Sequence, residues 1–134
     1  MKGTVVITAK IEQGVVNVLQ PGVVLFDQLS ESAKQRAVDD FCQFYLKEYR
    51  HGSLEILTEF PIQYEIEQIN HDIQQNRSFH PARLQAFLVE NDSQLFGNIL
   101  NAINESFLEN GAMANHHDYE DWYQEQYDAI KPGL

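Results

Sequence analysis

The sequence has no lysine or arginine between Arg83 and Lys131. That interval carries nine acidic residues: Glu90, Asp92, Glu105, Glu109, Asp118, Glu120, Asp121, Glu125 and Asp128. Residues 1–83 have a net charge of −3 and residues 84–134 a net charge of −8, which together give the −11 of the whole chain. Phosphate backbones and anionic membranes bind through clusters of basic side chains, so this charge disfavours nucleic acid and membrane as direct partners.

The chain is also poor in cysteine and in long apolar runs. The single cysteine excludes an internal disulfide, so we expect a reducing compartment and a cytoplasmic protein. No apolar run approaches the roughly 20 residues of a membrane span. Residues 1–10 hold too short an apolar run for a signal peptide. Without any repeat or linker-like stretch, the 134 residues, 43% hydrophobic, predict a single domain over 1–134 with its own core.

The N-terminal quarter has the two-residue period of β-strands. Apolar side chains alternate with polar ones over residues 4–12, and β-branched runs follow at 15–19 and 23–26. Pro21 and Gly22 fit the centre of a type II turn. These segments predict a small antiparallel β-meander. Residues 53–60 alternate in the same way and predict a possible further strand.

The rest of the chain changes to helical period. We expect a helix over residues 30–50, capped by Ser30 and ended by Gly52. Residues 61–76 fit a helix better than a strand, and Pro81 opens a short helix. Asp92 or Ser93 caps the next helix, which ends near Gly111, and the last helix covers 118–130. Strands followed by helices predict an α+β fold, with the meander packed against four to five helices.

The last helix is the main candidate site. Tyr119, Trp122, Tyr123 and Tyr127 form an aromatic stripe, and five acids surround it. Aromatic anchors with a charged rim are typical of protein-binding surfaces. The same pattern also fits a helix that docks on its own core and turns its acids to water. We predict partner binding by the following residues: Asp118, Tyr119, Glu120, Asp121, Trp122, Glu125 and Asp128.

Other candidate sites have simpler interpretations. His116 and His117 lack the spacing of a metal motif and fit a surface loop, so no metal or cofactor is expected. Cys42 lies on the apolar stripe of the first long helix and fits an inert core thiol. Arg77 and Arg83 flank Phe79 in a loop that can pair with the protein's own acids. The chain has 20 acidic residues, so neighbouring acids are expected by chance and do not indicate a catalytic pair.

These patterns favour a small acidic protein-binding domain without catalytic residues. Its partner would be a basic protein, such as a nuclease or toxin, whose nucleic-acid-handling surface it masks as an inhibitor or immunity-type protein does. The alternative is a structural or assembly subunit that uses the C-terminal aromatic helix as its interface. A small enzyme with a site built from dispersed acids, histidines or tyrosines is the third hypothesis, and no catalytic motif supports it.

Overall fold

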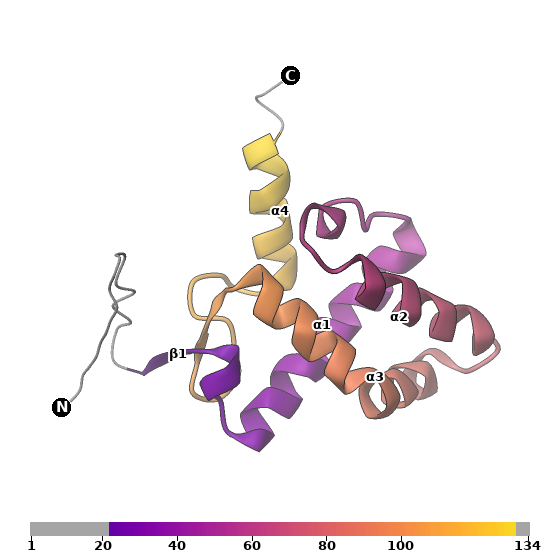
Figure 1. The fold of residues 1–134 in the computed structure, drawn as a ribbon, viewed down its shortest axis with the longest axis horizontal. Coiled ribbons are helices and arrows are strands. Elements are labelled where there is room, and N and C mark those ends of the chain that lie inside the picture. Colours follow the sequence, from indigo (N-terminus) through magenta and orange to yellow (C-terminus); the bar gives the residue numbers. More distant parts are fainter. Residues whose placement is uncertain (1–21, 131–134) are drawn as a thin grey trace.

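The computed structural model describes residues 22–130 (Figure 1). Strand β1, Val23–Leu25, leads through a 3₁₀ turn, Phe26–Gln28, into helix α1, Glu31–His51. A second 3₁₀ turn, Leu57–Glu59, precedes α2, Gln63–Gln75, and α3, Pro81–Ile103. Strand β2, Ser106–Leu108, and helix α4, Tyr119–Ile130, complete the described chain. In this part of the chain the broad α+β class is confirmed, with four α-helices and one two-stranded antiparallel sheet.

Helix α1 begins and ends where its capping residues predict. The Ser30 side chain accepts a hydrogen bond from the Ala33 amide at 3.2 Å, which satisfies one free donor of the first turn. At the other end Gly52 adopts a φ of +68°, the left-handed conformation that glycine tolerates best. One face of α1 is buried, and it includes Phe41, Cys42 and Tyr45 at zero exposure. The predicted helix over residues 30–50 is therefore confirmed.

Helices α2 and α3 pack against each other, and α3 also packs along α1. The helix predicted over residues 61–76 is confirmed as α2. The predicted boundary near Asp92 is a kink inside α3, because Asp92 has φ −114° and ψ 20° while the residues on both sides are helical. Phe96 lies in the centre of the core, with its ring 6.1 Å from Phe41 and 5.8 Å from Tyr45.

The sheet differs from the prediction. The predicted strand at residues 23–26 is present as β1, but its partner is β2, with Val24 opposite Phe107. The predicted strands at 4–12 and 15–19 lie outside the described residues. The helix predicted to continue to Gly111 ends at Ile103, because Asn104 adopts a φ of 57°. Phe107 continues the apolar spacing of the helix, which is why the pattern missed the strand.

The strand predicted at residues 53–60 is wrong. The segment forms turns and the short 3₁₀ helix Leu57–Glu59. Ile56 and Leu57 are both buried, at 3% and 0% exposure, although consecutive strand residues point to opposite faces. The tertiary contacts of this segment, above all those with α4, override its alternating pattern.

Helix α4 rises beyond the other helices in Figure 1, and its first two turns pack on α1. In the described residues, no helix is both long enough and apolar enough to cross a membrane.

Candidate functional site

The aromatic face of α4 packs into the protein core. Tyr119, Trp122 and Tyr123 are exposed by only 5%, 1% and 4%. The Tyr119 ring lies 5.2 Å from Phe41, and the Tyr123 ring lies 5.1 Å from Phe44, both edge to face. Offset and edge-to-face aromatic contacts of this kind stabilise packing beyond the area that they bury. Tyr119 and Trp122 therefore anchor the helix, and neither supplies the exposed aromatic surface that the sequence pattern predicted.

All five acids predicted for this site remain on the surface: Asp118, Glu120, Asp121, Glu125 and Asp128. They occupy the side of α4 that faces away from the core, as the helical period requires once the aromatic stripe is buried. The predicted site is therefore divided between two sides of α4. The aromatic side chains are buried against the core, and the acidic side chains are exposed.

Two of the acids shape the start of the helix. Asp118 accepts a hydrogen bond at Oδ1 from the Asp121 amide at 2.8 Å. Asp121 in turn accepts one at Oδ2 from the His117 amide at 3.1 Å. Carboxylates at a helix N-terminus satisfy free amide donors and complement the positive end of the helix dipole. These two acids therefore have a structural role as well as a negative charge.

Two further acids meet cationic or ionisable side chains. Glu120 Oε2 lies 2.5 Å from Lys47 Nζ on α1, and the hydrogen bond to Glu120 is the main reason that the pKa of Lys47 is raised. Glu125 Oε1 lies 2.9 Å from His116 Nε2, whose other ring nitrogen approaches Glu105 at 3.2 Å. The Lys47–Glu120 pair is exposed and contributes little to stability, whereas His116 is only 10% exposed. Glu125 itself is 66% exposed, so a partner can still reach it.

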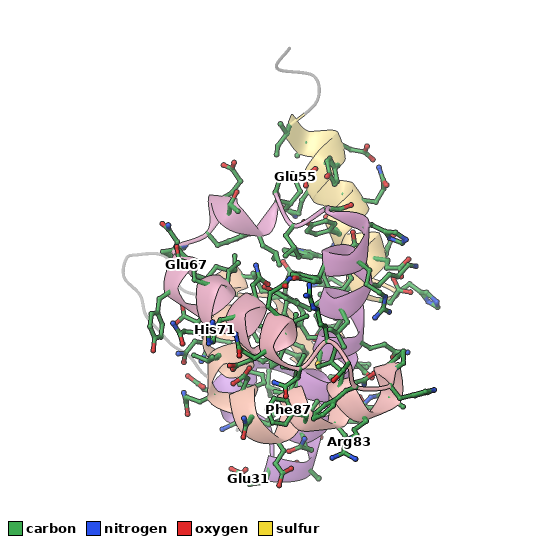
Figure 2. All side chains as sticks on the ribbon, turned by 90° about the vertical axis from the view of Figure 1, so that its right-hand side faces the viewer. Glu31, Glu55, Glu67, His71, Arg83 and Phe87 are labelled. Atoms are coloured by element: carbon green, nitrogen blue, oxygen red, sulfur yellow. The ribbon has the colours of Figure 1, made fainter. Side chains whose placement is uncertain are left out.

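The C-terminal end of α4 carries Tyr127 and the exposed acid Asp128. Asp128 accepts a hydrogen bond from the neutral Gln124 amide at 3.1 Å, a contact within the helix. Tyr127 donates its hydroxyl proton to Glu55, and Figure 2 shows Glu55 beside this helix. That hydrogen bond lowers the pKa of Glu55 and is the main cause that raises the pKa of Tyr127 to about 12.

The segment before α2 fixes the position of α4. The Tyr123 hydroxyl donates to the Ser53 carbonyl at 2.5 Å and accepts from the Ile56 amide at 3.2 Å. Burial raises the pKa of Tyr123, so the hydroxyl keeps its proton and can make both bonds. Trp122 lies against Phe60, with ring centroids 6.0 Å apart. Residues 53–60, which the sequence predicted as a strand, thus contact α4 and hold it in place.

Cys42, whose thiol the sequence analysis interpreted as inert, is a core residue. Cys42 has zero exposure, and burial, followed by the charges of Asp39 and Asp92, raises its pKa to about 12. A thiol with so high a pKa has almost no thiolate at neutral pH and is a poor nucleophile. Arg83 lies over the Phe79 ring at 4.7 Å, which places this cation against its own chain. Among residues 22–130, no group of three or more histidine, cysteine or acidic side chains is arranged to hold a metal ion.

The structure brings together one pair of acids that the sequence patterns did not indicate. Asp92, at the kink of α3, is 5% exposed and meets Asp72 of α2. Burial first, and then Asp72, raise the pKa of Asp92 to about 7. The two residues are far apart in the chain, so only the packing of α2 on α3 could have shown this pair.

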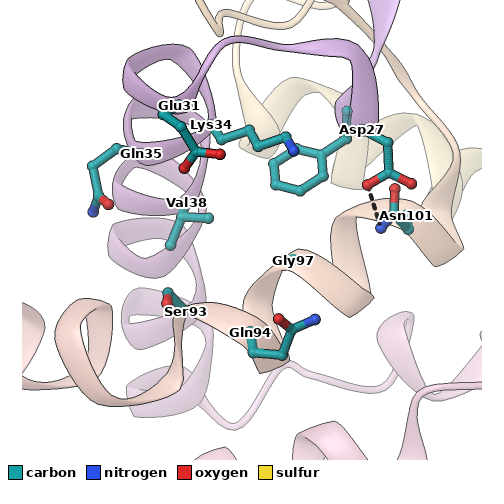
Figure 3. A pocket seen from close by; sticks show the side chains of 10 residues that line it. Asp27, Glu31, Lys34, Gln35, Val38, Ser93, Gln94, Gly97 and Asn101 are labelled. Atoms are coloured by element: carbon teal, nitrogen blue, oxygen red, sulfur yellow. Dashed lines mark hydrogen bonds between the residues drawn. The ribbon is translucent and has the colours of Figure 1, made fainter.

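A small groove lies between the first turns of α1 and the middle of α3 (Figure 3). It has a volume of about 270 Å³, and Asn101 donates a hydrogen bond to Asp27 across its edge at 3.1 Å. Amides and a hydroxyl supply much of its lining, with Gln35, Ser93 and Gln94 among them. Asp27, Glu31 and Lys34 also line it.

No protein-family model, no curated protein and no solved structure matches this chain. Its function therefore has to be inferred from the geometry of its own side chains.

Proposed function

We propose that this protein is an acidic protein-binding domain that uses the exposed face of α4 to mask a basic surface of a partner, as inhibitors and immunity proteins do. The partner we propose is a protein that handles nucleic acid, such as a nuclease or toxin, because its active surface must be basic to hold phosphates. Acids placed on a fixed scaffold can occupy such a surface in place of the phosphates.

The observation that supports this function is the two-sided character of α4. Its aromatic side is buried, so the helix is held in one orientation. Its acidic side is exposed, and residues 84–130 contain no lysine or arginine, so Lys47 of α1 is a cation that reaches this side from another helix, at Glu120. A rigid surface with an excess of negative charge speeds the encounter with a basic protein and lowers the entropy lost on binding.

The alternative of an assembly subunit loses the feature on which it rested. It required the aromatic stripe of the C-terminal helix as an interface, and Tyr119, Trp122 and Tyr123 already fill the protein's own core. The geometry therefore favours a contact through charge over a contact through aromatic residues.

The function can be tested by affinity capture from a cell extract at low and high salt, followed by titration of the captured partner with the purified protein. The binding variant is Glu125→Lys with Asp128→Lys, two exposed positions outside the helix-capping contacts. The matched control is Glu67→Lys with Glu90→Lys, which changes the net charge equally on α2 and α3; Glu67 lies on α2, away from α4, in Figure 2.

We expect the binding variant to lose about tenfold or more in affinity and the control to lose much less. We also expect the wild-type affinity to fall steeply as salt rises, because exposed charges are screened within roughly 10 Å at 0.1 M salt. Equal losses in the two variants, or an affinity that is independent of salt, would contradict the proposal.

A further inference from the structure

A second groove lies between α1 and the segment that leads into α4, with a volume of about 560 Å³. We call it the α1–α4 groove, and the residues that matter for it are Arg36, Asp40, Phe44, Lys47, Tyr119 and Glu120. Its volume falls within the range of roughly 300–1,000 Å³ that is common for binding pockets. It adjoins the acidic face of α4, because Glu120 belongs to both.

The apolar part of the groove is aromatic. Phe44 and Tyr119 line it, with ring centroids 6.0 Å apart. Both side chains are 5% exposed, so each is anchored in the core and only a small part of each borders the groove. A small, fixed apolar surface of this kind can contact the methylene stem of a long cationic side chain.

Two ion pairs line the same groove. Arg36 Nε lies 3.2 Å from Asp40 Oδ2 along α1, and Lys47 Nζ lies 2.5 Å from Glu120 Oε2 across the groove. All four side chains are 43–50% exposed, so both pairs face solvent. Pairs this exposed contribute little stability, so an incoming cation can replace the resident one at small cost. The groove already binds two cations through carboxylates.

The Tyr119 hydroxyl is the second observation that points to a ligand. It is buried, and it has no hydrogen-bond partner among the described residues. The charges that act on it most strongly are Asp40 and Arg36, both of which line the groove. A buried hydroxyl without a partner is unfavourable, and a guanidinium group carries five N–H donors that can supply one.

We propose that the α1–α4 groove receives an arginine side chain of the basic partner, with its stem against Phe44 and Tyr119 and its guanidinium group at Asp40 and Glu120. This inference rests on the proposed function and names the contact through which the partner is recognised. Lys47 and Arg36 move aside into water when the arginine binds, so carboxylates and cations stay paired throughout.

An anionic ligand fits the groove less well, although Arg36, Lys47 and Arg50 line it. Arg36 and Lys47 are already neutralised by Asp40 and Glu120. Asp118 adds a third carboxylate to the lining, which balances Arg50, and the chain as a whole has a net charge of −11. The negative field of the protein repels an anion and attracts an arginine side chain.

The test uses the full chain labelled with ¹⁵N and two small probes, Nα-acetyl-arginine amide and Nα-acetyl-glutamate amide. For arginine we expect amide shifts concentrated at residues 43–47 and 117–120, with a dissociation constant of about 1 mM or weaker. Smaller or scattered shifts are expected for glutamate. Shifts from arginine that avoid the groove, or stronger binding of glutamate at the groove, would overturn the proposal.

Three variants sharpen this test. Asp40→Asn with Glu120→Gln should weaken arginine binding by roughly threefold or more, since two surface carboxylates are lost. The control, Glu67→Gln with Glu90→Gln, removes two charges elsewhere and should change it little. Lys47→Ala frees Glu120 and should tighten arginine binding, an opposite effect that partial unfolding cannot imitate. If arginine binds with unchanged affinity both to Lys47→Ala and to the Asp40→Asn, Glu120→Gln variant, the groove is not the arginine site.

The outcome for the groove is separable from that for the proposed function. If arginine does not bind the groove but the partner loses affinity through Glu125→Lys and Asp128→Lys, only the groove proposal fails. If the partner is insensitive to those two changes, the proposed function of α4 fails whether or not free arginine binds the groove.

Discussion

The carboxyl group of Asp92 lies against that of Asp72, at the kink where α3 packs on α2. Asp92 is 5% exposed, and its Oδ2 atom has no hydrogen-bond partner among the described residues. Two carboxylates in such a place repel each other, and the buried Asp92 lacks the hydration that it would have in water. The pair is therefore most stable when it holds a proton.

This pair predicts that the free energy of unfolding falls as the pH rises from about 4 to about 7. The pKa of Asp92 is about 7 in the folded protein, against an ordinary value of 3.8. In that interval the folded state binds a proton that the unfolded state has released, so each rise in pH favours unfolding. Urea unfolding followed by circular dichroism at about pH 5 and about pH 8 measures the difference.

Asp92→Asn tests whether this residue is responsible. An amide stays neutral at both pH values, so the variant should be more stable than the wild type at about pH 8 and should vary less with pH. Glu90→Gln, on an exposed position two residues earlier in α3, is the control for the general effect of removing one negative charge. If both variants show the same pH dependence as the wild type, the buried pair does not titrate in this range.

Local sequence signals predicted the helices well, because each depends on residues close together in the chain. Ser30 caps the start of α1 through its side chain, and Gly52 ends the helix because glycine adopts the left-handed backbone conformation easily. Pro81 is the first residue of α3, and Asp92 marks its kink. The acidic face of α4 followed directly from helical period, once the aromatic residues were assigned to one side. The sequence pattern is compatible with either side facing the core, and the burial of Trp122 decides it.

The features that the sequence did not predict depend on contacts between distant segments. Leu54, Ile56 and Phe60 alternate like a strand, yet Tyr123 holds this segment as a turn through the carbonyl of Ser53. Strand β2 exists because β1 lies beside it. The α1–α4 groove and the Asp72–Asp92 pair arise from helix packing, for which no local spacing rule exists.

Gly111 should be one of the most sensitive positions in the protein. A Cβ atom there would lie 2.4 Å from the Ala33 carbonyl oxygen, and the residue has a φ of +94°. Gly111→Ala should therefore destabilise the fold by more than about 3 kcal/mol, from a clash and backbone strain together. Gly52→Ala is the matched control, since its φ of +68° carries strain but its Cβ meets no atom within 4 Å. Thermal unfolding of both variants gives the comparison, and similar losses would show that the contact with Ala33 is unimportant.

Tyr123→Phe should destabilise the protein by roughly 1–3 kcal/mol, because it leaves the buried Ile56 amide without an acceptor and the Ser53 carbonyl without a donor. Tyr127→Phe removes an exposed hydroxyl that bonds only to Glu55, so its effect should be below about 1 kcal/mol. Urea unfolding measures both losses. Hydrogen exchange at the Ile56 amide should rise in the first variant alone, and unchanged exchange there would mean that Tyr123 does not hold the turn.

Trp122→Ala distinguishes the packing of α4 from an interface made by its aromatic residues. Trp122 is 1% exposed and lies against Phe60 and Tyr123, so its removal should destabilise the fold by about 3–5 kcal/mol. The apparent mass from light scattering should not change at temperatures where the variant is folded. Tyr64→Ala, at a position that is 64% exposed, is the control and should be nearly neutral. A stable Trp122→Ala protein with a smaller mass than the wild type would instead show that α4 assembles chains through this side chain.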